Sequence, residues 1–561
     1  MSPRPCTPLL APRWLVACAA VVALLATACD VGVPPSASSG VTPTAAASET
    51  TPTGDTLRWA VAEPASIEPT TVVDDAGLVI VDSLFDSLTR VDADGRVRPS
   101  AAVRWRTPNR GRRWRFTLRS GARYHDGTPV RAEDFAQTWA LSVRQGLTGS
   151  HLQDVEGYRA VRAGRASTLS GVRAIDRRTL EVVMQRPSMD LPSIVAHPSL
   201  APLPPEGRTD PDAFAGQPIG NGPYRIAERW RRGPFIRVER DTAWHNGPHV
   251  RSDAQVREIL FRLLNRDAAY VGFQQGRIDV SGLPAGALQQ ATRTYGDAED
   301  GAGPGVVDVP LPSLYFLGMR LDRAPWDVAE VRRALSRAID RRALVEAQGD
   351  LALDPARWIV PPALSPRRGT AVCETCLHMP SLAEAAFAAA GVSEITLTID
   401  AGGAHDRVAR RIRTDLRQVG VDVTVRELPF EEYLAAVEDG ALALYRFGWH
   451  AQYASPAAML EPIIRSGAPA ERGDGANYGG YADDRVDRLL DRARTARSEQ
   501  RRRRLWARAE DRALADQAIV PLFAFRERTV LSDRVQGLEI TPWGTATPER
   551  ASIVSEPEIA P

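Results

Sequence analysis

The sequence predicts an α/β protein built from more than one lobe. Its 561 residues exceed the roughly 250–300 at which a single hydrophobic core stops growing. Residues 395–399 and 421–427 have the pattern of strands on either side of a helix over 408–419, and Gly420 ends that helix. Apolar and charged residues alternate over 114–119, which is typical of a half-buried strand. We therefore expect α/β layers in several lobes.

The remaining elements follow from apolar spacing and turn residues. Further short strands are predicted at 57–61, 179–184 and 235–239. Asp126-Gly127 marks a turn, and a helix with acidic residues in its first turn begins after it, at Ala132. Apolar positions at helical spacing predict one helix over 328–345, and residues 485–512 are predicted to form a long amphipathic helical region. The arginine run 501–504 inside the second is expected to be a solvated helix face.

Charge and motif content exclude several classes of protein. Lys+Arg number 70 and Asp+Glu 69, and because phosphate binding needs a basic excess, we expect no nucleic-acid partner. All of the cationic residues are arginine, which excludes Schiff-base and P-loop lysine chemistry. No G-x-S-x-G or H-E-x-x-H motif occurs. We therefore expect no enzyme, no catalytic residue and no cofactor.

The amino terminus predicts export. A positively charged start precedes the apolar run 15–26, which is too short to span roughly 30 Å of hydrocarbon and is typical of a signal-peptide core. Small residues then lead to Cys29, and 25–29 resembles a bacterial lipobox with its leucine one position early. We predict a signal peptide over 1–28 and a lipid on Cys29, with cleavage without lipidation as the alternative. The Ser/Thr/Pro-rich segment 29–54 buries too little surface to fold and is predicted to be a tether. The protein is then extracytoplasmic, anchored to the outer face of the cell membrane.

The body contains one cysteine pair, Cys373 and Cys376. Outside the cytoplasm such a pair can close a disulfide, which we favour over free thiols or a metal or redox role. His378 lies nearby, but there is no second cysteine pair and no clear fourth ligand. The eight histidines are scattered through the chain, so we expect no metal site.

Several segments, in order along the chain, resemble the extracytoplasmic solute-binding proteins of ABC transporters, family 5, the oligopeptide-, dipeptide- and nickel-binding type. The matching segments are 118–134 (LRSGARYHDGTPVRAED), 220–224 (GNGPY), 276–280 (GRIDV), 331–341 (VRRALSRAIDR) and 448–449 (GW), followed by Tyr481, 486–487 and 521–522. The resemblance covers roughly residues 55–545. Many of these residues also suit turns, tight backbone geometry and helix ends, so we expect most of them to define the fold and not to contact a ligand.

The resemblance implies a hinged clamp of two lobes, of the type II-like periplasmic-binding-protein fold, with an extra small domain. The implied divisions are lobe one at 55–82, 216–312 and 526–550, the small domain at 83–215, and lobe two at 313–525. A peptide or other small polar solute would bind between the lobes and be delivered to an ABC permease and its ATPase by a monomer. A sensor that uses the same clamp to signal to a partner, and a binder of a non-peptide ligand such as an oligosaccharide, are the alternatives.

One position departs from the peptide-binding pattern. In peptide-binding members an Asp in the G-W-x-[AG]-D segment pairs with the α-ammonium of the peptide, and here that position is Gln452, with His450 beside it. Because a buried ammonium favours a full negative charge, either the ligand lacks a free amino terminus or another carboxylate, such as Glu63 or Glu68, supplies the charge. We favour the first.

The candidate ligand-binding residues lie in both lobes. Trp449 is expected either to pack on a ligand face or to be a core aromatic. Residues 63–69 match the family's loop near the ligand backbone. The full set is Glu63, Ser66, Ile67, Tyr224, Tyr315, Trp449, Gln452 and Tyr453.

Overall fold

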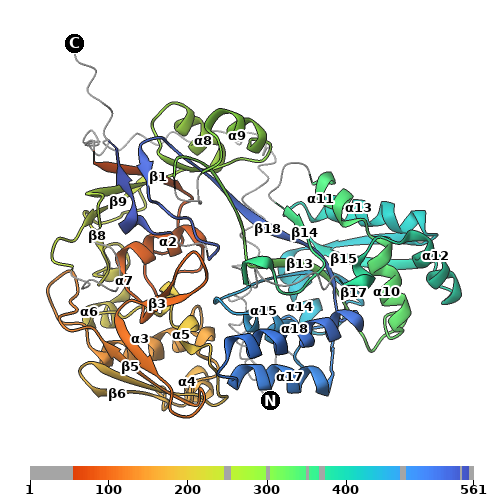
Figure 1. Cartoon of the computed structure of the whole chain (residues 1–561), viewed down its shortest axis with the longest axis horizontal. Helices are drawn as coiled ribbons and strands as arrows, with labels where there is room; N and C mark the ends of the chain where they lie inside the picture. Colours follow the sequence, from red (N-terminus) through yellow and green to blue (C-terminus); the bar gives the residue numbers. More distant parts are fainter. Residues whose placement is uncertain are drawn as a thin grey trace, which may run out of the picture.

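The computed structural model of the chain has the predicted α/β architecture. It describes residues 55–244, 254–298, 303–348, 353–364, 373–467, 475–543 and 546–554. The predicted signal peptide and tether, with Cys29, lie outside these residues. Figure 1 shows two bodies joined by the long strand β18 (Val520–Leu531). No helix of the described ranges is both long and apolar enough to cross a membrane.

A mixed sheet of twelve strands runs through both bodies. Five strands form the sheet of the first lobe: β1 (Thr56–Val61), β8 (Tyr224–Ile226), β9 (Phe235–Arg240), β10 (Glu258–Leu263) and β11 (Val280–Gly282). Four form that of the second lobe: β13 (Ser313–Met319), β15 (Glu394–Asp400), β16 (Asp422–Leu428) and β17 (Leu444–His450). Parallel pairing of β15 with β16, joined through α13 (His405–Gln418), is the predicted β-α-β unit.

Strand β18 passes from one lobe to the other. Its first half pairs with β13 and with β14 (Leu353–Pro355), and its second half pairs with β11 and with β12 (Gly305–Pro310). Only Leu311 and Pro312 separate β12 from β13, so this pair crosses at the same place. Crossing strands that lie together at one junction form a place about which the two lobes can rotate.

A small domain lies between α2 (Asp75–Leu84) and β8. Its sheet has the order β4-β5-β7-β6, formed by β4 (Ala102–Arg106), β5 (Arg113–Leu118), β7 (Thr179–Val183) and β6 (Val172–Asp176). Helix α3 (Ala132–Gln145) packs on this sheet through Phe135 and Trp139, both fully buried. The predicted strands at 114–119 and 179–184 and the helix after Ala132 are confirmed.

Shorter elements complete the three parts. The first lobe and small domain also contain β2 (Thr89–Val91), β3 (Val97–Pro99), α4 (Tyr158–Arg162), α5 (Leu191–Ile194), α6 (Pro205–Thr209), α7 (Pro211–Ala215), α8 (Arg266–Gln274) and α9 (Leu288–Tyr295). The second lobe contains α12 (Pro380–Ala389), α14 (Phe430–Glu438) and α15 (Ala457–Ile464), and the carboxyl-terminal segment forms β19 (Val535–Gln536) and β20 (Ser552–Ile553).

The two long predicted helices are each divided by a capping residue. Residues 328–345 form α10 (Ala329–Ala338) and α11 (Arg341–Ala347), because the Asp340 carboxylate accepts the backbone N–H groups that begin the second helix. Residues 485–512 likewise form α17 (Asp484–Thr495) and α18 (Glu499–Ala515), with Ser498 as the cap. The prediction of a single helix over 328–345 was wrong, since the apolar spacing continues across the break, whereas the predicted helical region over 485–512 is confirmed.

The two most specific motif segments contact each other. The backbone N–H of Gly220 donates to His125 Nδ1 at 3.1 Å, and the backbone N–H of His125 donates to the Gly220 carbonyl at 2.9 Å. A Cβ on Gly220 would lie 1.9 Å from the carbonyl oxygen of Leu84, so only glycine fits there. The Asn221 amide pairs with the backbone of Asp86 in both directions. These motif residues therefore join the small domain to the first lobe.

Candidate functional site

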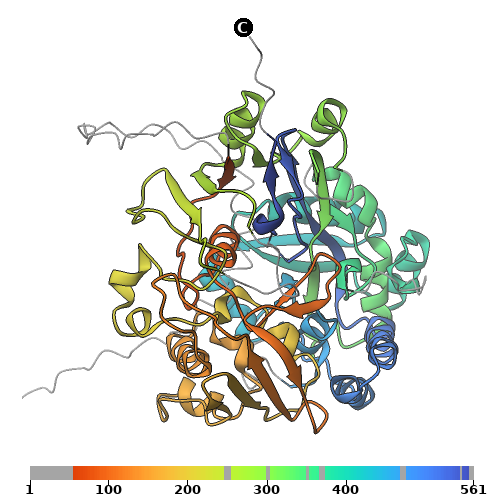
Figure 2. The same ribbon diagram turned by 60° about the vertical axis from the view of Figure 1, so that its left-hand side comes forward.

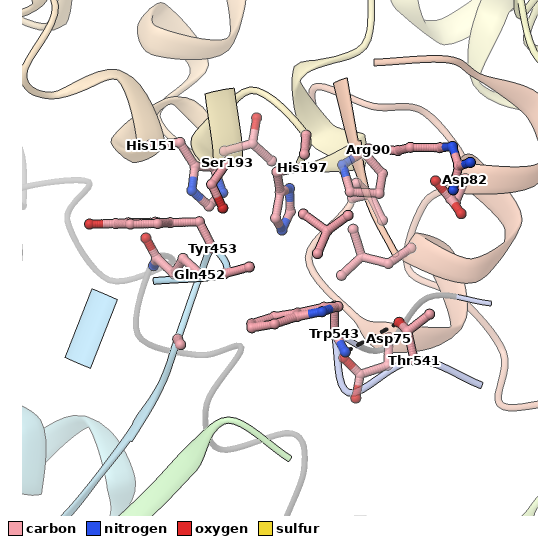
Figure 3. A pocket seen from close by; sticks show the side chains of 18 of the residues that line it. Asp75, Asp82, Arg90, His151, Ser193, His197, Gln452, Tyr453, Thr541 and Trp543 are labelled. Carbon is pink, nitrogen blue, oxygen red and sulfur yellow. Dashed lines mark hydrogen bonds between the residues drawn. The ribbon is translucent and has the colours of Figure 1, made fainter. Parts of the chain in front are cut away.

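A cavity of about 200 Å³ lies where the three parts of the chain meet. The residues that line it belong to the segments 72–82, 90–91, 147–151, 193–198, 450–454 and 541–549. The first lobe supplies α2, the small domain supplies the next three segments, and the second lobe supplies the segment that follows β17. The described residues 541–543 and 546–549, which lie between β19 and β20, form the remaining wall (Figure 3). Each part of the clamp thus contributes to one cavity.

Two predicted ligand residues, Gln452 and Tyr453, line this cavity. The segment that carries them leaves β17 through a bond from the Ala451 N–H to the Pro312 carbonyl (2.8 Å) and turns before α15. Tyr453 packs against the apolar cores of both the second lobe and the small domain. Burial and then the charge of Asp190 raise the pKa of Tyr453 well above its ordinary value, so its hydroxyl is neutral and keeps its proton.

Trp449 and Ile67 lie in the apolar cores, outside the lining of the cavity. Trp449 is 8 % exposed, and its indole N–H donates to the Ala458 carbonyl at 2.8 Å. Its ring belongs to the core cluster of the second lobe, which is the second of the two roles expected for it. Ile67 is fully buried in the core of the first lobe.

The two predicted tyrosines are also core residues. The hydroxyl of Tyr224, which is fully buried, donates to the carbonyls of Val256 and Pro548 at 3.3 and 3.2 Å. The hydroxyl of Tyr315 lies 3.1 Å from His405 Nδ1, and burial raises its pKa. Neither tyrosine lines the cavity. Their aromatic character identified them from the sequence, but both hydroxyls are satisfied by the scaffold.

The acidic loop of the first lobe also lies away from the lining. Glu63 is exposed. Glu68 is 2 % exposed, and its carboxylate accepts the Thr70 and Thr71 hydroxyls at 2.9 and 2.8 Å. Burial raises the pKa of Glu68, and these hydrogen bonds partly oppose the rise. Ser66 bonds to Thr71 at 2.7 Å and completes the loop. Hydrogen bonds within the loop therefore engage Glu68 and Ser66.

Three histidines line the cavity: His151, His197 and His450. Their proximity in the fold was not predicted from the sequence. The rings of His151 and His197 have their centroids 4.3 Å apart. Burial lowers the pKa of His151 and of His450 to about 4. Burial also lowers the pKa of His197 well below its ordinary value, and the charges that His151 and His450 would carry lower it as well. All three are therefore neutral at pH 7. They are far apart in sequence, so no local spacing could reveal the cluster.

A buried ion-pair network holds the small domain against the second lobe. The Arg494 guanidinium of α17 contacts Asp154 of the small domain at 2.5 Å and Glu461 of α15 at 3.7 Å. Arg186 of the small domain also reaches Glu461, at 3.1 Å. Burial would raise the pKa of Glu461, but Arg494, Arg465 and Arg186 outweigh it and hold the value at about 2. Glu461 is therefore ionised at any physiological pH.

Two further contacts extend this network along the same boundary. The backbone N–H of Met189 donates to the Arg494 carbonyl at 2.9 Å. Arg502, from the arginine run of α18, forms an ion pair with Asp190 of the small domain. The run is thus a solvated face, as predicted, except at Arg502, which is mostly buried. Figures 1 and 2 both place α17 and α18 beside the small domain.

The cysteine pair lies outside the lining of the cavity. Cys373 and Cys376 are joined in a disulfide, and the Cys376 carbonyl accepts a hydrogen bond from the buried Arg341 guanidinium at 2.9 Å. Within the described ranges, no group of three or more histidine, cysteine and acidic side chains is placed to hold a metal ion. The cavity offers neutral imidazoles, hydroxyls and an amide as hydrogen-bonding groups, and carboxylates with one guanidinium as charged ones.

We predict that the cavity histidines make the fold sensitive to acid. The unfolded chain takes up protons near pH 6.5 whereas folded His151 does so only near pH 4, so stability falls as the pH drops through this window. His151→Phe should flatten this fall by at most about 3 kcal/mol, as measured by urea unfolding between pH 7 and 4. His378→Phe, at the surface, is the control. Parallel curves for His151→Phe and the wild type would contradict the prediction.

The comparisons with known proteins agree with this architecture. The family profile described as bacterial extracellular solute-binding proteins, family 5 Middle, matches residues 96–470, more than half of the chain. The dipeptide-binding protein DppE of Bacillus subtilis (strain 168) is 25% identical over 505 residues, which cover 86% of this chain and 89% of DppE. The probable deoxycholate-binding periplasmic protein YgiS of Escherichia coli (strain K12) is 25% identical over 486 residues, which cover 82% of this chain and 86% of YgiS.

A solved structure gives the same picture of the fold. The unliganded, open form of the periplasmic murein tripeptide-binding protein MppA of Escherichia coli aligns with a TM-score of 0.75 and 22% identity. The alignment covers 90% of this chain and 98% of that one. The mixed sheet, the crossing strand β18, the small domain and the family match lead to one conclusion: the chain belongs to the extracellular solute-binding proteins of family 5.

Proposed function

We propose that this protein binds a peptide or peptide-like solute in the cavity between its lobes and delivers it to an ABC permease and its ATPase. The observation that carries this proposal is the position of the cavity, whose walls come from both lobes, the small domain and the carboxyl-terminal segment. A solute that touches all of these walls stabilises the closed clamp by its differential affinity for that state. The clamp itself would work as a monomer.

The names of relatives support a peptide as the solute. DppE is described as binding dipeptides and MppA as binding a murein tripeptide. Peptides present amide groups at regular spacing, and the cavity offers matching neutral partners in Gln452, Tyr453 and the three histidines. Neutral partners suit amides because no charge has to be desolvated.

A non-peptide organic solute is the second candidate. One relative, YgiS, is described as a probable deoxycholate-binding protein, so the family is not restricted to peptides. The apolar residues Val72, Leu78 and Trp543 of the cavity would suit the body of such a ligand.

We also propose that the chain is exported and held at the membrane by a lipid on Cys29. The apolar run 15–26, the small residues before Cys29 and the tether that follows it support this. In a bacterial host the wild type should sediment with membranes, and Cys29→Ala should move into the soluble extracytoplasmic fraction. Cys18→Ala, inside the signal peptide, is the control. Equal soluble fractions of all three proteins would contradict the proposal.

Binding is tested by native mass spectrometry of the purified protein with a pool of random tripeptides to pentapeptides. We expect peptide complexes, and Gln452→Ala should weaken them about tenfold because the amide loses its hydrogen bonds to the ligand. Gln290→Ala, on the exposed face of α9, should bind like the wild type. If no peptide binds and a steroid-like or sugar ligand is retained from the host instead, the peptide proposal fails in favour of the second candidate.

A further inference from the structure

The cavity contains more negative than positive groups at neutral pH. Its lining includes the carboxylates of Asp75, Asp82 and Glu549, and one guanidinium, that of Arg90. Because the three lining histidines are neutral, they do not offset this excess. A neutral lining would have needed two further cationic side chains, and the described lining residues include none beyond Arg90. The lining side chains therefore carry a net negative charge, and its consequence depends on which of the carboxylates already has a partner in the chain.

Among the three carboxylates, Asp75 stands apart. Asp82 and Glu549 each interact with another group of the chain. Asp74, the neighbour of Asp75, caps α2: its two oxygens accept the backbone N–H groups of Gly77 and Ala65 at 2.8 and 2.9 Å. Within the part of the chain that the structure describes, no hydrogen bond or ion pair joins the carboxylate of Asp75.

The surroundings of Asp75 disfavour an isolated negative charge. Its side chain is exposed to the cavity, yet protein surrounds the cavity on several sides (Figure 3). Burial raises the pKa of Asp75, the charge of Asp74 raises it further, and Arg266 only partly opposes them. A cation placed against this carboxylate would reverse that balance, since an opposite charge nearby favours the ionised form.

We infer that Asp75 is the specificity-determining residue that binds the ammonium group of the solute. In this chain Gln452 stands where a charged partner is expected, and neither Glu63 nor Glu68 lines the cavity. Asp75 lines the same cavity as Gln452 from the opposite lobe, so it supplies the missing negative charge. The solute is then a molecule with a free amino group, such as a short peptide with an unblocked amino terminus. This inference rests on the proposed peptide-binding function.

The test compares two pools of random tripeptides to pentapeptides, one with free and one with acetylated amino termini, by native mass spectrometry. The wild type should prefer the free-amine pool by about tenfold or more, and Asp75→Asn should reduce that preference to about twofold or less. Asp75→Glu should keep it. Asp267→Asn, an exposed aspartate in the first turn of α8, removes the same charge from a similar helix position away from the cavity and should keep it too.

Each other result has a separate meaning. A wild type that binds both pools equally, or a preference that survives in Asp75→Asn, overturns the inference and leaves the proposed function intact. Equal loss of binding to both pools in Asp75→Asn also overturns it, because a charge-specific contact should spare the acetylated peptides. If the wild type binds neither pool, the proposed peptide-binding function itself fails.

Discussion

The contact between Arg494 and Asp154 is the constraint on which the cavity depends. Arg494 belongs to the second lobe and Asp154 to the small domain. Arg494 also contacts Glu461 of its own lobe, and Glu461 in turn contacts Arg186 of the small domain. Because breaking one member of a buried ion pair leaves the other charge unpaired, this contact stabilises the arrangement in which the small domain lies against the second lobe. That arrangement sets the segment 450–454 against the histidines of the small domain, and so it shapes the wall of the cavity.

The charge states of buried groups differ between the cavity and the boundary that joins the small domain to the second lobe, and the difference has a physical reason. At the boundary, several guanidiniums surround Glu461 and keep it ionised despite burial. In the cavity, burial acts on His151 and His450 without a compensating carboxylate and leaves them neutral. The protein thus places its network of strong ionic contacts in the scaffold, and in the cavity it combines neutral imidazoles, hydroxyls and an amide with the carboxylates and with Arg90. Because the ion pairs of Arg494 and Glu461 are formed within the scaffold, different solutes can bind in the cavity without breaking them.

Much of the fold followed from the sequence, but only part of the site did. Strands such as β5 and the unit from β15 to β16 were predictable because alternation and helix-ending glycines are local signals. The break at Asp340 was missed because the apolar spacing continues through it. Gln452 and Tyr453 were found through a motif, whereas tertiary contacts alone bring the three histidines and Asp75 to the cavity. Of the two roles that the sequence left open for Trp449, the structure shows the core role, with its indole N–H donating to the Ala458 carbonyl.

The most direct measurement is a double-mutant cycle across the boundary. The free energy of unfolding is compared among the wild type, Arg494→Met, Asp154→Asn and the double variant. A cycle on the exposed pair Arg410 and Asp406 within α13 serves as the reference. We expect a coupling of about 2 kcal/mol or more across the boundary and about 0.5 kcal/mol or less for the reference pair. Equal, near-zero couplings would contradict the claim that this contact holds the small domain to the second lobe.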